Sequence, residues 1–145
     1  MNRLFATLSV CLTLGFLVRV VGQVIQVFWP VSFLPMLEMW QGSGLPYPIL
    51  LPAQIVILGF MGWVSWRMAV GRTVFGHRAS KGLFIFGVLY FLVMGARLVL
   101  GLTIYSDILW FASPIPASFH LVLAAEVMLI SAYDRALAEQ ASRLE

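Results

Sequence analysis

Charged residues are scarce in this chain. Aspartate, glutamate, lysine and arginine make up 10% of the 145 residues, whereas apolar types make up 61%, and the mean hydropathy is +0.97. A water-soluble domain of this length would lack the polar residues needed to cover its surface. The composition therefore excludes a soluble globular domain and predicts an integral membrane protein that folds as one domain over residues 1–145.

Cysteine and histidine are also scarce, which removes several kinds of site. Cys11 is the single cysteine, so the chain has no internal disulfide, no C-x-x-C redox pair and no cysteine-built metal centre. His77 and His120 fall on opposite sides of the expected membrane, so they cannot be the two axial ligands of one haem. The Gly-x-Gly-x-x-Gly pattern of dinucleotide binding is absent as well. We expect no metal site and no nucleic-acid partner, and the residue pattern identifies no cofactor.

Long apolar stretches are what the sequence has in abundance. They cover about residues 4–28, 49–70, 83–103 and 117–133. A transmembrane helix needs roughly 20 residues, so the first three stretches are long enough and the last is short unless it continues past Tyr133. The chain is therefore predicted to be an all-α bundle of four transmembrane helices. Residues 134–145 are expected to extend the last helix into the cytoplasm as a solvated end.

Basic residues lie on only one side of these spans. The loops at residues 29–48 and 104–116 contain neither lysine nor arginine. Apart from two arginines inside the spans, every basic residue falls near the termini or near the loop at residues 71–82: Arg3, Arg67, Arg72, Arg78, Lys81, Arg135 and Arg143. Cytoplasmic loops of membrane proteins carry an excess of lysine and arginine. We therefore expect both termini in the cytoplasm and a location in the bacterial inner membrane.

The two outer loops are rich in proline and in aromatic residues. Prolines stop helices at the membrane surface, and tryptophan and tyrosine gather at the interface between lipid and water. Residues 33–41, inside the first outer loop, are predicted to form a short helix that lies in the interface with its apolar face toward lipid. The aromatic residues suited to the interface are Trp29, Trp40, Tyr47, Tyr105 and Trp110.

Polar side chains inside the spans are the candidates for function, because an ionisable group in hydrocarbon costs on the order of 3 kcal/mol. At a rise of 1.5 Å per residue, Arg19 and Arg97 fall in the outer third of the membrane, within a core about 30 Å thick. Gln54, His120 and Glu126 fall within about 14 Å of the outer surface by the same rise. All four helices thus contribute polar groups to one outer layer.

Helical spacing groups several of these residues on single faces. Spacings of three and four residues define one face of the first helix, with Arg19, Gln23 and Gln26, and one face of the third, with Tyr90, Met94 and Arg97. We expect both faces to point inward. A carboxylate near the middle of the membrane needs a cationic partner or a bound proton. Glu126 is therefore expected to pair with Arg97 or Arg19.

This layer predicts a pocket in the outer half of the bundle that binds a lipid or another amphipathic small molecule, with membrane lipids as the expected partners. Arg19 and Arg97 would contact an anionic headgroup, and Gln23, Gln54 and Tyr90 would add hydrogen bonds. Whether the chain is an enzyme stays open. The tentative catalytic residues of an intramembrane enzyme are Glu126 and His120, because only they can be tuned for proton transfer near neutral pH.

Three other interpretations fit the same residues. In the first, the polar groups are purely structural, with Arg19 extending to the interface and an ion pair between Arg97 and Glu126 holding two helices together. In the second, the chain is a non-catalytic accessory subunit, and Trp63 and Trp66 pack against a larger membrane complex. In the third, it is a small proton-coupled transporter that acts as a homo-oligomer. Transport requires polar groups on both sides, and the sequence has them on one.

The charge asymmetry predicts the topology. With Cys11 replaced by serine, a Ser43→Cys variant should react with an impermeant thiol reagent in intact cells, since Ser43 belongs to a loop without basic residues. An Ala79→Cys variant should react only after permeabilisation, as shown by the mass added to the protein. The opposite pattern would place the termini outside.

Overall fold

The computed structural model describes residues 2–40, 45–105, 108, 111 and 113–143. Its long helices are α1 (Asn2–Phe28), α3 (Tyr47–Ala69), α4 (His77–Thr103) and α6 (Pro114–Ser142), and a short helix, α2 (Leu37–Trp40), lies between the first two. In this part of the chain, four helices are long and apolar enough to cross a membrane. The expected all-helical bundle with four candidate spans is confirmed.

The boundaries differ from the expected ones mainly at the ends that carry charge. Helix α4 starts at His77 instead of about residue 83, and α6 runs from Pro114 to Ser142 instead of stopping near Tyr133. Hydropathy underestimates both helices because their polar end turns are helical too. The last span is therefore long enough.

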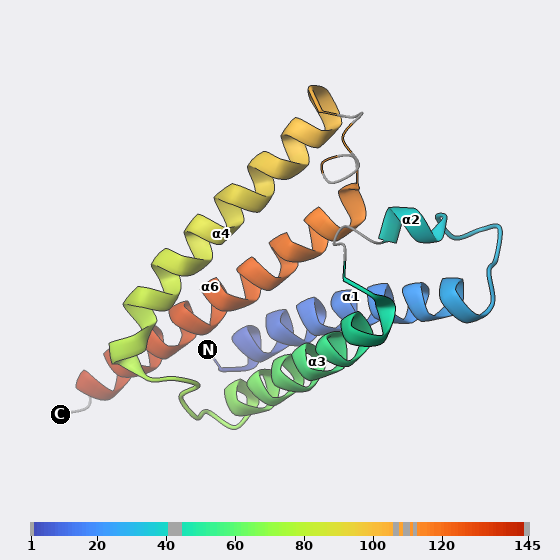
Figure 1. Cartoon of the computed structure of the whole chain (residues 1–145). Coiled ribbons are helices and arrows are strands. Elements are labelled where there is room, and N and C mark those ends of the chain that lie inside the picture. The colour runs from blue at the N-terminus through green and yellow to red at the C-terminus, as the bar shows by residue number, and fades with distance from the viewer. Residues whose placement is uncertain (1, 41–44, 106–107, 109–110, 112, 144–145) are drawn as a thin grey trace.

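The helices form two antiparallel hairpins. Helix α1 packs along α3, and α4 packs along α6, with α1 and α6 making the main contact between the hairpins. Figure 1 shows α4 and α6 running away from α1 and α3 toward the end of the bundle opposite the termini. We call this the outer end, following the orientation expected from the charges. The short helix α2 contacts both α1 and α6 there.

A glycine ends α3 in a defined way. Gly71 has a φ of +73°, which glycine adopts without strain. The Gly71 amide donates to the Met68 carbonyl at 3.2 Å, and the Arg72 amide donates to the Arg67 carbonyl at 2.9 Å. This pair of bonds is the Schellman motif. It turns the chain sharply toward α4, which keeps the inner ends of both hairpins together.

Asp134 then fixes this inner connection onto α6. Its carboxylate accepts hydrogen bonds from the backbone amides of Val74, Phe75 and Gly76, each at 2.8 Å. The side chain is completely buried. The expected helical extension past Tyr133 is present, but the expectation of a solvated end is wrong at Asp134, because three amides of the loop need an acceptor there.

The first outer loop also differs from expectation. Of the expected helix at 33–41, residues 33–36 are not helical and residues 37–40 are, and its position in the membrane interface stays a prediction. Trp40 is 7% exposed, so the protein covers its ring, and its place in an interfacial belt stays a prediction. A Cβ at Gly22 would lie 2.8 Å from Cη2 of the Trp40 ring, so the ring packs directly on α1. Residues 41–44 and Trp110 lie outside the described residues.

The Asp134 contacts predict a large loss of stability on substitution. Hydrogen bonds to a charged group contribute about 1.5–3 kcal/mol each, so Asp134→Ala should lower the free energy of unfolding in detergent by about 3 kcal/mol or more. Asp134→Asn keeps one acceptor oxygen and should lose less. Glu139→Ala removes an exposed carboxylate from the same helix and should change little. Equal effects of Asp134→Ala and Glu139→Ala would contradict the role of Asp134.

Candidate functional site

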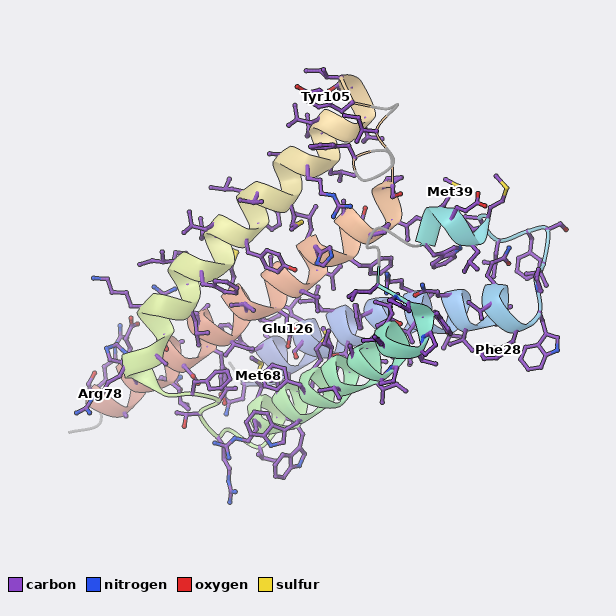
Figure 2. The ribbon with its side chains drawn as sticks, viewed as in Figure 1. Phe28, Met39, Met68, Arg78, Tyr105 and Glu126 are labelled. Carbon is purple, nitrogen blue, oxygen red and sulfur yellow. The ribbon has the colours of Figure 1, made fainter. Side chains whose placement is uncertain are left out.

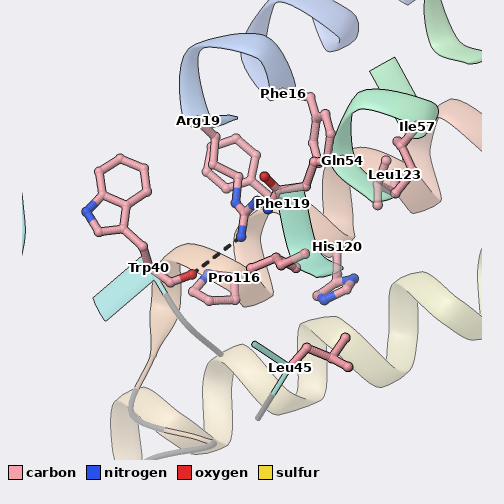
Figure 3. Close-up of a pocket in the computed structure, with 11 residues that line it drawn as sticks. Phe16, Arg19, Trp40, Leu45, Gln54, Ile57, Pro116, Phe119, His120 and Leu123 are labelled. Atoms are coloured by element: carbon pink, nitrogen blue, oxygen red, sulfur yellow. Dashed lines mark hydrogen bonds between the residues drawn. The ribbon is translucent and has the colours of Figure 1, made fainter. Parts of the chain in front are cut away.

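A cavity of about 170 Å³ lies at the outer end between α1, α3 and α6, with α2 beside it (Figure 3). Three of the expected site residues line it, namely Arg19, Gln54 and His120. The rest of the wall is mainly apolar and includes Phe16 and Phe119. The structure thus brings residues from three helices to one cavity, at the end of the bundle where the hairpins diverge.

Arg19 has few partners for a buried cation. Its side chain is 7% exposed, and its guanidinium donates to the Trp40 carbonyl at 3.4 Å (Figure 3). The guanidinium carbon lies 5.9 Å from the centroid of the Phe16 ring and 5.5 Å from that of Phe119. Among the described residues, Nε has no hydrogen-bond acceptor. A guanidinium carries five donors, so cation–π contacts and one long hydrogen bond leave it under-satisfied.

Two glutamines form the next layer of the site. Gln54 Nε2 donates to Gln23 Oε1 at 3.0 Å, and both side chains are buried. Gln23 Nε2 and Gln54 Oε1 find no hydrogen-bond partner within the described part of the chain. Gln26, on the same face of α1, instead accepts the Val31 amide at 3.2 Å and so stabilises the turn after the helix.

Helix α4 contributes to the site indirectly, because its Tyr90 contacts His120 of α6. Tyr90 and His120 form a hydrogen bond of 2.5 Å between the phenol oxygen and Nδ1, and their rings meet edge to face. Arg97 is 4% exposed and close enough to both rings to interact electrostatically. Tyr90 and Arg97 therefore interact with His120 but are not among the residues that line the cavity. Their expected contact with a ligand stays a prediction.

Glu126 is the clearest departure from the expected site. Its Oε1 accepts a hydrogen bond from the Ser9 hydroxyl at 2.6 Å, and Figure 2 shows it where α6 passes α1. The described residues contain no ion pair with Glu126, so the expected pairing with Arg97 or Arg19 is wrong. The reason is depth: Arg19 is ten residues beyond Ser9 on α1, about 15 Å along the helix axis.

Sequence reasoning missed the partners of Glu126. Ser9 contacts Ser65 of α3 at 2.8 Å between hydroxyl oxygens, and Thr13 donates to the Ser9 carbonyl at 2.8 Å. The available signal was the spacing of Ser9 and Thr13, four residues apart on one face of α1. Small hydroxyl residues are common in transmembrane helices, so this spacing alone did not indicate a site.

Comparisons of the chain with protein-family models, curated proteins and solved structures give no match. The described residues hold no cluster of three histidine, cysteine, aspartate or glutamate side chains suited to a metal ion. The functional interpretation therefore rests on the chemistry of the cavity and of the groups around Glu126.

The glutamine pair predicts a measurable coupling. Gln54→Leu and Gln23→Leu should each destabilise the protein by about 1–3 kcal/mol, because each leaves a buried amide without its partner. The double variant should lose less than the sum, with a coupling of about 1 kcal/mol in a thermal unfolding series. Gln54→Leu combined with Gln140→Leu, an exposed position on α6, is the control and should be additive. Additivity in both pairs would contradict the contact.

Proposed function

We propose that the cavity at the outer end binds the headgroup of an anionic, amphipathic molecule, most simply a membrane lipid. The observation that carries the proposal is the buried Arg19 guanidinium on the cavity wall, which has one long hydrogen bond to a carbonyl. A buried charge is costly unless it is paired and hydrogen-bonded. A phosphate or carboxylate in the cavity would supply the missing acceptor.

The charge of Arg19 on the cavity wall supports an anionic ligand over a cationic one. Arg19 Nε lacks an acceptor among the described residues, while Gln54 Oε1, also on the wall, lacks a donor. Gln23 Nε2 lacks an acceptor too, but Gln23 does not line the cavity. Charge-assisted bonds from a guanidinium to phosphate or carboxylate are among the stronger hydrogen bonds in proteins.

The helix ends beside the cavity favour the same sign of charge. Leu50 near the start of α3 and Pro116 near the start of α6 both line it. The dipole of each helix favours an anion at its start; few amides contribute directly, because Pro48, Pro114 and Pro116 have no N–H and the Ile49 and Leu50 amides donate to Pro46. Two such ends at one cavity add to the positive charge of Arg19.

The size of the cavity indicates how much of the ligand it holds. A volume of about 170 Å³ is close to the roughly 150 Å³ cavity that takes up one benzene molecule. This is enough for a compact headgroup but not for an acyl chain. Phe16 and Phe119 on the wall suit the first carbons next to the headgroup, and the chains would remain in the surrounding lipid.

Orientation and catalysis are parts of this proposal. With the termini in the cytoplasm of a bacterial cell, the cavity would face the outer leaflet of the inner membrane, as the one-sided distribution of basic residues supports. If the bound molecule is also transformed, His120 is the candidate acid or base, since it lines the cavity and is held by Tyr90. Glu126 does not line it, so the proposal gives it no part in this chemistry.

Native mass spectrometry of the protein in mild detergent tests the proposal. The wild type should retain an anionic lipid or metabolite, and Arg19→Gln should weaken retention about tenfold or more, because a charged hydrogen-bond partner contributes about 1.5–3 kcal/mol. Arg19→Lys should keep part of the binding. Arg72→Gln, at an exposed position in the loop after α3, should bind as the wild type does.

Two results would overturn the proposal. Equal retention by the wild type, Arg19→Gln and Arg72→Gln would show that Arg19 is structural. A wild type that carries no ligand, and takes up none from added vesicles of anionic lipid, would favour the accessory subunit, which a stoichiometric protein partner would then identify.

A further inference from the structure

A second polar site lies deeper in the bundle, apart from the headgroup cavity. Glu126 of α6 is 2% exposed and meets Ser9 of α1, which in turn meets Ser65 of α3. Three helices therefore join at one carboxyl group. Its second oxygen, Oε2, is buried and has no hydrogen-bond partner among the described residues.

The hydroxyl contacts are completed differently in the two protonation states of Glu126. If Glu126 is ionised, the single hydroxyl proton of Ser9 goes to the carboxylate. Ser65 must then donate to Ser9, so that the Met61 carbonyl, 3.0 Å from the Ser65 hydroxyl, loses this donor. The carboxylate itself keeps one donor for two oxygens, which is a poor environment for a buried charge.

If Glu126 is a carboxylic acid, every hydroxyl proton has an acceptor. The acid donates to the Ser9 oxygen across 2.6 Å, Ser9 donates to Ser65 across 2.8 Å, and Ser65 donates to the Met61 carbonyl across 3.0 Å. The remaining oxygen, Oε2, is then a neutral carbonyl oxygen, which costs much less to bury without a donor than half of a carboxylate does.

Within the described residues, no charged side chain is hydrogen-bonded or ion-paired to Glu126. Ser9 donates to it at 2.6 Å, Ser9 contacts Ser65, and the Thr13 hydroxyl lies 3.5 Å from that of Ser65. We compared the ionisable residues nearest in sequence to Ser9, Ser65 and Glu126, together with Tyr90 of α4. Each is exposed, hydrogen-bonded to another group, or at least about 9 Å away along the helix axis. They are Arg3, Cys11, Arg19, Arg67, Tyr90, His120 and Asp134.

The hydroxyl chain ends at a groove on the surface of the bundle. Ser65 and Thr13 line a groove of about 330 Å³ between α1 and α3, and its other walls are mainly apolar residues of these two helices. In a membrane this surface faces lipid. A lipid-soluble molecule that enters the groove therefore meets the end of the chain that leads to Glu126.

We propose that Glu126, Ser9 and Ser65 form a proton-binding site inside the membrane, in which Glu126 holds the proton as a carboxylic acid and the groove between α1 and α3 gives access to it. This site is separate from the headgroup cavity and does not depend on it. Such a carboxyl group is the kind that couples proton movement to the work of a membrane protein.

A lipid-soluble carbodiimide tests both parts of the proposal. Dicyclohexylcarbodiimide adds to a carboxylic acid: the acid oxygen bonds to the central carbon and the acid proton moves to a nitrogen. The O-acylisourea formed then rearranges to a stable N-acylurea, and nothing leaves. An ionised carboxylate lacks the proton that this addition needs. The reaction therefore reports a protonated carboxyl group that the reagent can reach from lipid.

The full chain in mild detergent or in vesicles should gain the mass of one carbodiimide, and peptide mapping should place it on Glu126. Labelling should slow as the pH is raised, because less of the acid remains. Glu38 and Glu139 are exposed and serve as internal controls that should stay unlabelled. Glu126→Gln should abolish the labelling, provided that it elutes from size exclusion as the wild type does.

A matched pair of variants tests the hydroxyl chain. Ser65→Ala removes the acceptor of the Ser9 proton in the acid state but leaves the bond from Ser9 to an ionised Glu126, so labelling near neutral pH should slow about fivefold, the effect of one hydrogen bond. Val10→Ala changes the same groove wall outside the chain, since Val10 carries no hydroxyl. It should label at the wild-type rate.

Three results would overturn the proposal. Failure of Glu126 to react in the folded protein, when it reacts after unfolding in acid, would show that it is ionised or closed to the groove. Equal rates for Ser65→Ala and the wild type would remove the chain. Protection by sodium but not by potassium would assign these oxygens to a cation instead of a proton. None of these results bears on ligand retention at Arg19.

Discussion

The arrangement of the bundle depends on the hydrogen bonds that the loop after α3 donates to the Asp134 carboxylate. Three backbone amides in that loop donate to one carboxylate of α6, and this carboxylate is completely buried. The loop joins the two hairpins, so this attachment holds their inner ends together. Ala6, Met68 and Tyr133 pack into one apolar cluster at the same end. Because the hairpins are joined there, any divergence between them must open at the outer end.

The outer end is filled by the first outer loop instead of by direct helix contact. Helix α2 places Trp40 against Gly22, where a glycine lets the ring approach α1 closely. Trp40 also lines the cavity. Arg19 is tied to the Trp40 backbone, so the loop that closes the cavity also positions its cation. Binding at the cavity is therefore expected to be sensitive to changes in this loop.

The sequence predicted the four long helices well, because apolar length alone decides whether a segment can cross a membrane. It also predicted that Arg19, Gln54 and His120 lie in one layer, since depth follows from the rise per residue, and all three line the cavity. It failed at two buried acids. Glu126 was matched to an arginine by chemistry, but it meets Ser9, which lies about 15 Å from Arg19 along α1. Asp134 was expected to be solvated because its sequence neighbours are polar, and the amides that it binds are about 60 residues earlier in the chain.

Arg19 and Glu126 are far apart in the bundle, so each of these two buried groups is surrounded by its own set of side chains. Two opposite charges in one hydrocarbon region would normally neutralise each other, and a designed bundle would gain stability by letting them meet. Here they lie at different depths, about 15 Å apart along α1, with the apolar cluster of Phe16, Val20 and Met61 around the intervening turns. Each charge must then be compensated separately. Among the described residues, Arg19 has one carbonyl acceptor and no carboxylate partner, and Glu126 has the Ser9 hydroxyl and no cation, which is why we propose an external anion for the first site and a proton for the second.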